Sequence, residues 1–348
     1  MRSWMARKRH GIPVILLGMG VFVALISVVS PWPTALIIRA AFEDQAAKTV
    51  KEMQAYQPAA GIGQKLDVPY GADGKNTTFD VFSPANSAGL LPTVMWIHGG
   101  AWISGDKANV RPYARILASH GYTVVAVNYT VAPEAVYPVA VTQLNDALGF
   151  LTAHAHQYRI DTDRIVIAGD SAGSQYTAQL ATMITSPVYA AQVGLTPAIS
   201  PNQVRGVVLN CGIYDVNGIP DAPGIGGWGF RTALWAYLGT KDWSNTRGGQ
   251  LMGTLDDVTA DFPTTWISGG NADPLTANQS EPLAARLTKL GVDVTSVFYP
   301  KNTEPALPHE YQFHLDFDAS KSALSSTIAF LDRVTARPRP LSKSGIAG

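Results

Sequence analysis

The chain of 348 residues is electrically balanced, with 26 Lys and Arg against 26 Asp and Glu, and 46% of its residues are hydrophobic. This composition is typical of a packed globular α/β protein and excludes a disordered or fibrous chain. The balanced charge excludes a global field that would recruit nucleic acid, and a single cysteine, Cys211, excludes an intramolecular disulfide and a thiolate zinc cluster.

The amino-terminal residues 1–40 combine a basic cluster with a long apolar stretch. Four basic residues precede residues 12–29, which are about long enough to cross a membrane as a helix. Because this stretch is longer than the apolar region usual in a cleaved signal sequence, we expect residues 1–40 to form an uncleaved anchor. Because the basic residues come first, we expect the catalytic body on the periplasmic or extracellular side. The alternatives are secretion after cleavage of a signal sequence and a buried soluble helix. Residues 41–64, with helix-forming residues of mixed charge, predict a stalk helix and linker.

Strand-like and helix-like stretches alternate over residues 65–336, which predicts βαβ units and one α/β domain. We expect a mostly parallel central sheet flanked by helices. The expected strands are residues 77–82, 93–97, 123–127, 165–168, 204–209, 265–268 and 294–299, and the expected helices are 110–119, 139–154, 171–184, 281–290 and 319–335. An aromatic and glycine-rich segment, 213–261, interrupts the alternation and predicts a lid-like insertion. Residues 337–348 predict a disordered tail.

A glycine-flanked serine gives the strongest chemical signal. Residues 169–173 read Gly-Asp-Ser-Ala-Gly, between an expected strand and an expected helix. A tight strand-to-helix turn exposes the serine hydroxyl, and the glycines let neighbouring backbone approach closely. We therefore expect Ser171 to be a nucleophile activated by a base. The alternative is a glycine-rich turn in which Ser171 only caps the helix.

A second motif, His-Gly-Gly-Ala-Trp at residues 98–102, directly follows another expected strand. Adjacent glycines leave backbone N–H groups free to point into a cavity. The amides of Gly99 and Gly100, with that of Ala172, can then bind the oxyanion of a tetrahedral intermediate. We expect His98 to be a buried residue that supports this loop rather than the catalytic base. The two motifs together favour a serine hydrolase.

The sequence resembles the hormone-sensitive-lipase-like esterases of the α/β-hydrolase superfamily over about residues 66–335. The resemblance rests on His-Gly-Gly-Ala, on Gly-Asp-Ser-Ala-Gly and on residues 128–134, which are similar to the family's Tyr-Arg-Leu-Ala-Pro-Glu segment. Ala101 replaces the third glycine of the strictest motif but keeps its N–H, and Thr130 stands where arginine is usual. The resemblance implies an α/β-hydrolase fold and hydrolysis of carboxylic esters without a metal or other cofactor.

The family's chain order of serine, acid and histidine implies that both partners of Ser171 follow it in the sequence. Asp273 lies in Gly-Asn-Ala-Asp-Pro-Leu, which is similar to the family's acid-bearing turn; the alternative is an Asp-Pro helix cap. Two histidines lie beyond Ser171, namely His309 and His314. We favour His309 as the base because it lies in the loop between the last expected strand and the final helix.

Further residues complete the prediction. Trp102 and Tyr129 are candidates for the wall of the substrate pocket, with core packing as the alternative for Trp102. Asp106 and Asp170 are expected to fix loops as hydrogen-bond acceptors.

The predicted substrate is a small-molecule ester of small to medium acyl chain. Cleavage of amide bonds by the same triad, or a catalytically silent membrane-tethered binding protein, remain alternatives, and neither the natural substrate nor the oligomeric state follows from the sequence.

Overall fold

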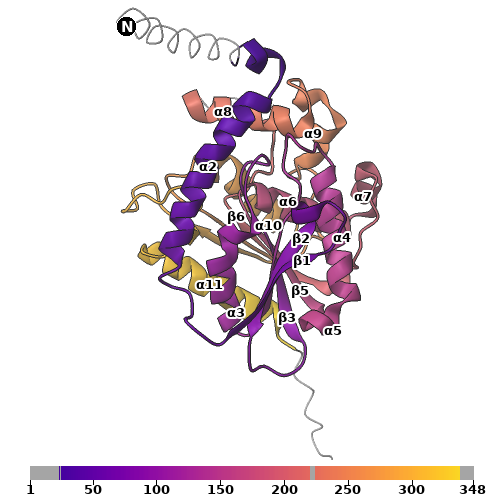
Figure 1. The fold of residues 1–348 in the computed structure, drawn as a ribbon, viewed down its shortest axis with the longest axis vertical. Helices are drawn as coiled ribbons and strands as arrows, with labels where there is room; N and C mark the ends of the chain where they lie inside the picture. The colour runs from indigo at the N-terminus through magenta and orange to yellow at the C-terminus, as the bar shows by residue number, and fades with distance from the viewer. Residues whose placement is uncertain (1–22, 24, 220–223, 338–348) are drawn as a thin grey trace, which may run out of the picture.

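The computed structural model describes residues 23, 25–219 and 224–337, which form a mostly parallel sheet covered by helices (Figure 1). The sheet has eight strands in the order β1-β2-β4-β3-β5-β6-β7-β8 within these residues. The strands are β1 (Ile62–Pro69), β2 (Thr78–Pro84), β3 (Leu91–Ile97), β4 (Thr123–Val127), β5 (Ile160–Asp170), β6 (Val204–Asn210), β7 (Thr265–Gly269) and β8 (Val294–Phe298). β2 runs antiparallel to both of its neighbours, and the other neighbouring pairs are parallel, so the expected sheet is confirmed.

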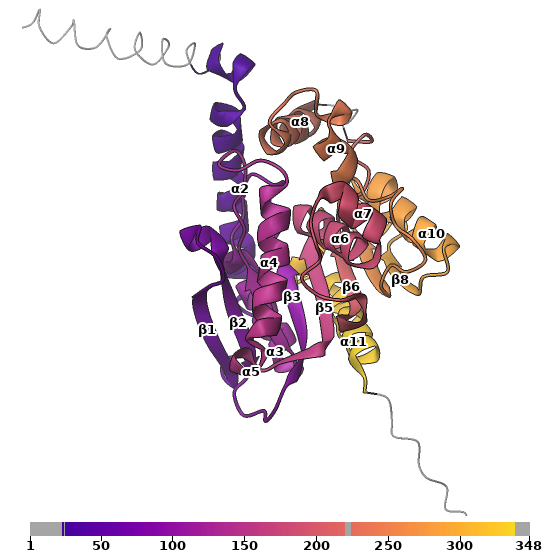
Figure 2. The ribbon, with the colours of Figure 1, turned by 90° about the vertical axis from the view of Figure 1, so that its right-hand side faces the viewer.

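Helices cover both faces of this sheet (Figure 2). The helices are α2 (Trp32–Met53), α3 (Arg111–Ser119), α4 (Val139–Ala153), α5 (Ala155–Tyr158), α6 (Ala172–Thr185), α7 (Pro187–Val193), α8 (Gly224–Leu238), α9 (Arg247–Met252), α10 (Glu281–Lys289) and α11 (Asp318–Thr335). Side chains of α4, α6 and α10 belong to the core on one face, and those of α3 and α11 belong to the core on the other.

The central strands are apolar over most of their buried positions because both of their faces are covered. In β4, Val125 and Val127 pack into one core, whereas Val124 and Ala126 pack into the other. This burial explains why the central strands appear in the sequence as continuous apolar runs. Parallel strands also bring their carboxyl ends to one edge of the sheet, where ligands commonly bind in open α/β folds. The loops after β3, β5, β7 and β8, which carry the predicted site residues, meet at this edge.

Several elements were not among those expected, namely β1 and the helices α5, α7, α8 and α9. β1 is an edge strand with mostly exposed side chains, so it lacks an apolar pattern. The insertion at 213–261 contains α8 and α9 in its described part.

The amino-terminal prediction is only partly within the described structure. Most of residues 12–29 lie outside it, as do residues 338–348 of the predicted tail. Among the helices formed by the described residues, none is both long enough and apolar enough to span a bilayer. Residues 41–53, expected in a stalk, belong instead to α2, which lies along the body (Figures 1 and 2). Burial of Met53 in the core beside α3 is one reason for this position.

Candidate active site

Ser171 occupies a sharp turn between β5 and α6. Its backbone has φ 51° and ψ −119°, a conformation that non-glycine residues rarely adopt. A Cβ atom on Gly169 would lie 2.4 Å from the carbonyl carbon of Gly173, and one on Gly173 would lie 2.0 Å from the carbonyl oxygen of Ile97. Both flanking glycines are therefore required by close backbone approach, as the sequence predicts. The Ser171 N–H donates to the carbonyl of Asn210 at 2.8 Å, which fixes the turn to β6.

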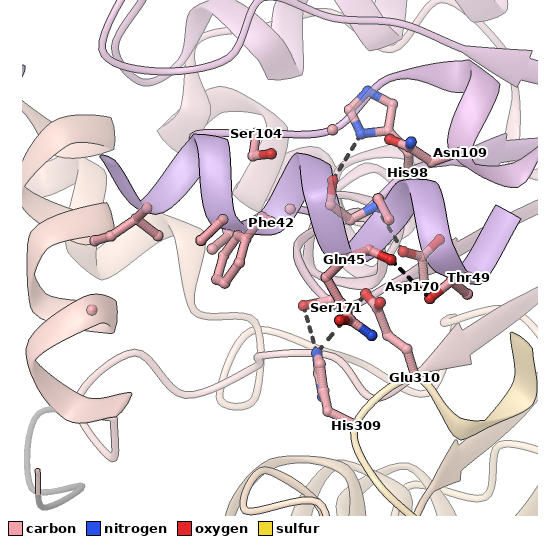
Figure 3. Close-up of a pocket in the computed structure, with 18 of the residues that line it drawn as sticks. Phe42, Gln45, Thr49, His98, Ser104, Asn109, Asp170, Ser171, His309 and Glu310 are labelled. Carbon is pink, nitrogen blue, oxygen red and sulfur yellow. Dashed lines mark hydrogen bonds and ion pairs between the residues drawn. The ribbon is translucent and has the colours of Figure 1, made fainter. Parts of the chain in front are cut away.

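The three predicted residues Ser171, His309 and Asp273 lie in hydrogen-bonding contact. The Nε2 atom of His309 is 2.9 Å from Ser171 Oγ, and its Nδ1 atom is 2.9 Å from Asp273 Oδ2 (Figure 3 shows the first contact). The two loops that carry the acid and the histidine are also joined, because the Ala272 N–H donates to the Leu307 carbonyl at 3.0 Å. This geometry places the imidazole where it can accept the serine proton while the carboxylate orients the ring.

The charge around His309 favours its protonated form. Burial of the ring lowers the pKa of His309, but the carboxylates of Asp273, Glu310 and Asp170 oppose this effect and raise the pKa to about 9. The main contribution comes from Asp273, which is hydrogen-bonded to the ring. An imidazolium formed by proton transfer from Ser171 would therefore be stabilised at this position.

The alternative base, His314, lies elsewhere. Its Nδ1 atom is 2.8 Å from Glu52 Oε2, near the end of α2. This contact links the loop before α11 to α2. The structure therefore brings only His309, of the two histidines, to Ser171.

The loop after β3 holds its glycines in a strained, compact form. Gly100 has φ 116°, and a Cβ atom there would lie 2.3 Å from the Ser104 carbonyl oxygen. The Gly99 N–H donates to Asp170 Oδ2 at 2.8 Å. Gly99 was expected to donate to an oxyanion, but its amide already has an acceptor. The N–H of Ala172, at the first position of α6, has no intrahelical acceptor and is available near Ser171.

Asp170 and Asp106 have the loop-fixing contacts that the sequence analysis expected. Asp170 accepts from Trp96 Nε1 at 2.7 Å as well as from Gly99. Asp106 accepts from the Ala108 N–H at 2.8 Å. Both carboxyl groups therefore hold the backbone of the loop after β3.

His98 is buried and supports this loop from behind. Its Nδ1 atom is hydrogen-bonded to the Gly99 carbonyl at 2.8 Å. Its ring stacks on the ring of Tyr129, with 4.4 Å between the ring centroids, and the Tyr129 hydroxyl donates to the His98 carbonyl. Burial lowers the pKa of His98, which keeps the ring neutral.

Trp102 is fully buried and donates to Gln175 Oε1 at 2.9 Å. Neither Trp102 nor Tyr129, the two predicted pocket residues, lies among those that line the cavity.

A cavity of about 570 Å³ lies over Ser171 and His309, and its wall comes largely from two helices. The lining side chains include Ile37, Ile38, Phe42, Gln45 and Thr49 of α2 and Trp228 and Phe230 of α8. Figure 3 shows α2 crossing beside Ser171, with Phe42 and Gln45 on it. We refer to α2 and α8 together as the cap. The predicted insertion supplies α8, but the contribution of α2 was not predicted, although its apolar residues recur at helical spacing.

Arg39 fixes α2 to the body of the protein. Its Nη1 and Nη2 atoms contact the two carboxylate oxygens of Glu134 at 2.7 and 2.6 Å. Its Nε donates to the Ile103 carbonyl at 2.6 Å, and Nη2 also donates to the Ala132 carbonyl at 2.7 Å. The hydrogen bond from Arg39 lowers the pKa of Glu134, so this carboxyl group stays ionised. The segment that resembles the family's Ala-Pro-Glu sequence therefore holds the cap.

One cluster in the described residues has the atom types of a metal site. Potential ligand atoms of Cys211, Asp273 and His309 lie within 4.8 Å of one another. Both ring nitrogens of His309 are already hydrogen-bonded, and burial raises the pKa of the Cys211 thiol well above its usual value. A protonated thiol and an occupied imidazole are poor metal ligands. We therefore assign this cluster to the Ser171 site and not to a metal.

Known proteins are similar to this chain in sequence and in structure. The protein named "Putative alpha/beta hydrolase R526" of Acanthamoeba polyphaga mimivirus is 32% identical over 238 residues, which cover 64% of this chain and 63% of that protein. LipM of Mycobacterium tuberculosis, described as a probable carboxylic ester hydrolase, is 31% identical over 159 residues, covering 45% of this chain and 36% of LipM. The crystal structure of esterase B from Lactobacillus rhamnosis has a TM-score of 0.74 at 22% identity, covering 87% of this chain and 95% of that one.

One protein-family model matches a part of the chain that contains most strands of the sheet. The chain spans less than two thirds of the length of both sequence relatives, so their activities are not transferred as a whole. The structural similarity to esterase B shows that the chain has the expected α/β-hydrolase fold. The BD-FAE family model matches residues 79–287, which include Ser171 and Asp273. The chain belongs to the BD-FAE family of α/β-hydrolases.

Proposed function

We propose that the protein hydrolyses carboxylic esters through an acyl-serine formed on Ser171. The proposal is carried by the continuous chain of 2.9 Å contacts from Ser171 through His309 to Asp273 beside an apolar cavity. His309 accepts the serine proton at Nε2 as Oγ attacks the ester carbonyl, and Asp273 stabilises the imidazolium. The same proton then passes to the leaving alcohol, and hydrolysis of the acyl-serine by water restores the enzyme.

The oxyanion of each tetrahedral intermediate is held, in this proposal, by the amides of Gly100, Ala101 and Ala172. Gly100 and Ala101 are consecutive residues with positive φ in the loop over Ser171. Ala101 replaces Gly99 in this role because the Gly99 N–H is bonded to Asp170. Fixed backbone donors of this kind stabilise the charge that develops in the transition state.

We propose an uncharged ester of small to medium acyl chain as the substrate. The cavity volume of about 570 Å³ lies within the range usual for small-molecule pockets. Lysine and arginine are absent from the described residues that line it, whereas aromatic and aliphatic side chains of α2 and α8 are present. Such a lining favours apolar acyl or alcohol groups over anionic ones.

Ser171→Ala tests the proposed function directly. The full chain, purified in detergent, is assayed with p-nitrophenyl esters from acetate to decanoate and with a fluorophosphonate label. We expect the wild type to be labelled and active, and Ser171→Ala to lose roughly 10⁴-fold or more of kcat. The variant should unfold at the same temperature as the wild type because the removed hydroxyl is not part of the core. Full activity in the variant would contradict the proposal.

We propose in addition that residues 12–29 attach the protein to a membrane, with the catalytic body on the periplasmic or extracellular side. Their apolar sequence and the preceding basic residues support this location. The test is extraction of membranes with alkaline carbonate, comparing the full chain with a chain that begins at Pro31 and so retains α2. Release of the full chain by carbonate would contradict membrane insertion.

A further inference from the structure

Glu310 directly follows His309 and lines the cavity on the same side as the reacting atoms. Its Oε1 atom is 3.9 Å from His309 Nε2, and its side chain is 32% exposed. Figure 3 shows its carboxylate between His309 and Asp170, close to Ser171. No role for Glu310 was expected from the sequence, although its position directly after the predicted base was a signal.

The backbone of Glu310 adopts an unfavourable conformation that directs its side chain into the site. Its φ is 58°, a left-handed value that glycine or asparagine adopts at lower cost. Its N–H donates to Cys211 Sγ at 3.3 Å, which fixes this conformation from the buried side. Strain of this kind, when it places a polar group beside reacting atoms, points to a role in the reaction.

The Glu310 side chain also contacts Asp170. A side-chain hydrogen bond joins Glu310 to Asp170, and burial together with the nearby Glu310 charge raises the pKa of Asp170 well above its usual value. This contact holds the Glu310 carboxyl group beside Asp170 in the wall of the cavity, which both residues line.

We propose that Glu310 positions the water molecule that hydrolyses the acyl-enzyme. The 3.9 Å between Glu310 Oε1 and His309 Nε2 is too long for a direct hydrogen bond. A water molecule with hydrogen bonds of about 2.8 Å to each of these atoms fits between them. The inference rests on the proposed function, because it requires an acyl group on Ser171.

The step balances without any further reactant. After the alcohol leaves, His309 is neutral, and the water donates one O–H to its Nε2 and the other to Glu310. The water oxygen forms a bond to the acyl carbon as its first proton passes to Nε2. The tetrahedral intermediate then collapses, the bond from the acyl carbon to Ser171 Oγ breaks, and Nε2 returns the proton to Oγ. Glu310 accepts a hydrogen bond throughout and keeps its charge. It takes no part in formation of the acyl-enzyme, when the alcohol of the ester occupies this space.

The test is Glu310→Leu in the full chain, with p-nitrophenyl butyrate as substrate. Because p-nitrophenolate leaves readily, formation of the acyl-enzyme should be fast and its hydrolysis should limit kcat. Loss of a hydrogen bond to a charged acceptor is expected to lower the rate constant of acyl-enzyme hydrolysis about tenfold or more. KM should fall by at least the same factor, so that kcat/KM does not decrease. Loss of the Glu310 charge, which raises the pKa of His309, can only increase the neutral fraction of the ring and with it kcat/KM. A larger p-nitrophenol burst is expected in stopped flow. Glu310→Gln keeps an acceptor oxygen and should show a smaller loss.

Glu304→Gln is the matched control, since Glu304 is exposed on the same loop and should change none of these values. The acyl-enzyme is measured directly by mass spectrometry of quenched samples. A parallel fall of kcat and kcat/KM in Glu310→Leu, or no change in either, would overturn the assignment. An inactive wild type would refute the proposed function itself, so the two failures are distinguishable. A purely structural role for Glu310 would not separate kcat from kcat/KM.

Discussion

The turn at Ser171 and the α2 part of the cap border the same cavity but are stabilised in different ways. In α6, which follows the turn, every residue from Ala172 to Ile184 is buried. In α2, only Ala35 and Met53 are buried, Ile38 packs partly against the core, and polar contacts of Arg39 and Glu52 add to the attachment. Dense packing tolerates little change, whereas a helix held by a few polar contacts can shift without unfolding the protein. The turn should therefore control catalysis and stability together, and α2 should control which esters are accepted.

The largest expected effect is that of Gly173→Ala, which tests the packed turn. The new Cβ would lie 2.0 Å from the Ile97 carbonyl oxygen and 2.7 Å from that of His98, so the backbone of these two residues leaves no room for it. We expect the free energy of unfolding to fall by about 2–4 kcal/mol and the activity to be lost. Urea denaturation and ester hydrolysis measure the two effects. Gly63→Ala is the control, because its nearest new contact is 3.7 Å. A stable, active Gly173→Ala would show that the turn is not rigid.

The next effect is the pH dependence of kcat/KM, which reports the protonation of His309. Acylation needs the neutral ring, and the carboxylates around it raise its pKa to about 9 despite burial. The neutral fraction, and with it kcat/KM, should rise about fiftyfold from pH 7 to pH 9. The ion pair with Asp273 stabilises the folded state below the ordinary pKa of histidine, and this contribution is lost as pH rises through about 9. A rate that is already maximal at pH 6 would contradict this assignment.

A smaller and more selective effect is expected from Arg39→Met, which removes the contacts of Arg39 to Glu134 and to two carbonyls. Loosening of α2 should raise KM for p-nitrophenyl octanoate about three- to tenfold, because a long chain reaches Phe42. Hydrolysis of the acetate should change little. Arg39→Lys keeps the charge but not the two-pronged contact, and should behave like Arg39→Met. Equal losses for both esters would show that α2 acts on catalysis and not on selectivity.

The smallest effect is expected from Glu52→Gln, which removes the contact between α2 and His314. The Glu52 side chain is 51% exposed, and ion pairs of this kind contribute little in water. We expect a change of less than about 0.5 kcal/mol in the free energy of unfolding, measured by urea denaturation. Lys48→Gln, in the exposed pair with Asp44, provides the comparison. A loss above about 1 kcal/mol would mean that this end of α2 is held as firmly as the turn.

The central strands and the Ser171 turn were predictable because their causes are local. Burial on both faces requires a run of apolar residues, which is visible in the sequence, and the turn requires glycines at fixed positions. The position of α2 was not predictable in this way. Arg39 and Glu134 are 95 residues apart, and nothing near Arg39 in the sequence indicates its partner. The exposed edge strand β1 was missed for a related reason, since few of its side chains enter the core.

The sequence by itself determined the α/β architecture, the nucleophile turn and the candidate residues Ser171, Asp273 and His309, because these follow from short-range sterics and motif order. Only the tertiary structure decided which amides and carboxylates face the cavity. It paired the Gly99 amide with Asp170 and placed Asp170 and Glu310 together in the wall of the cavity. Hydrogen bonds and charges act through space, so their partners are set by how the sheet brings distant loops to one edge and not by neighbours along the chain.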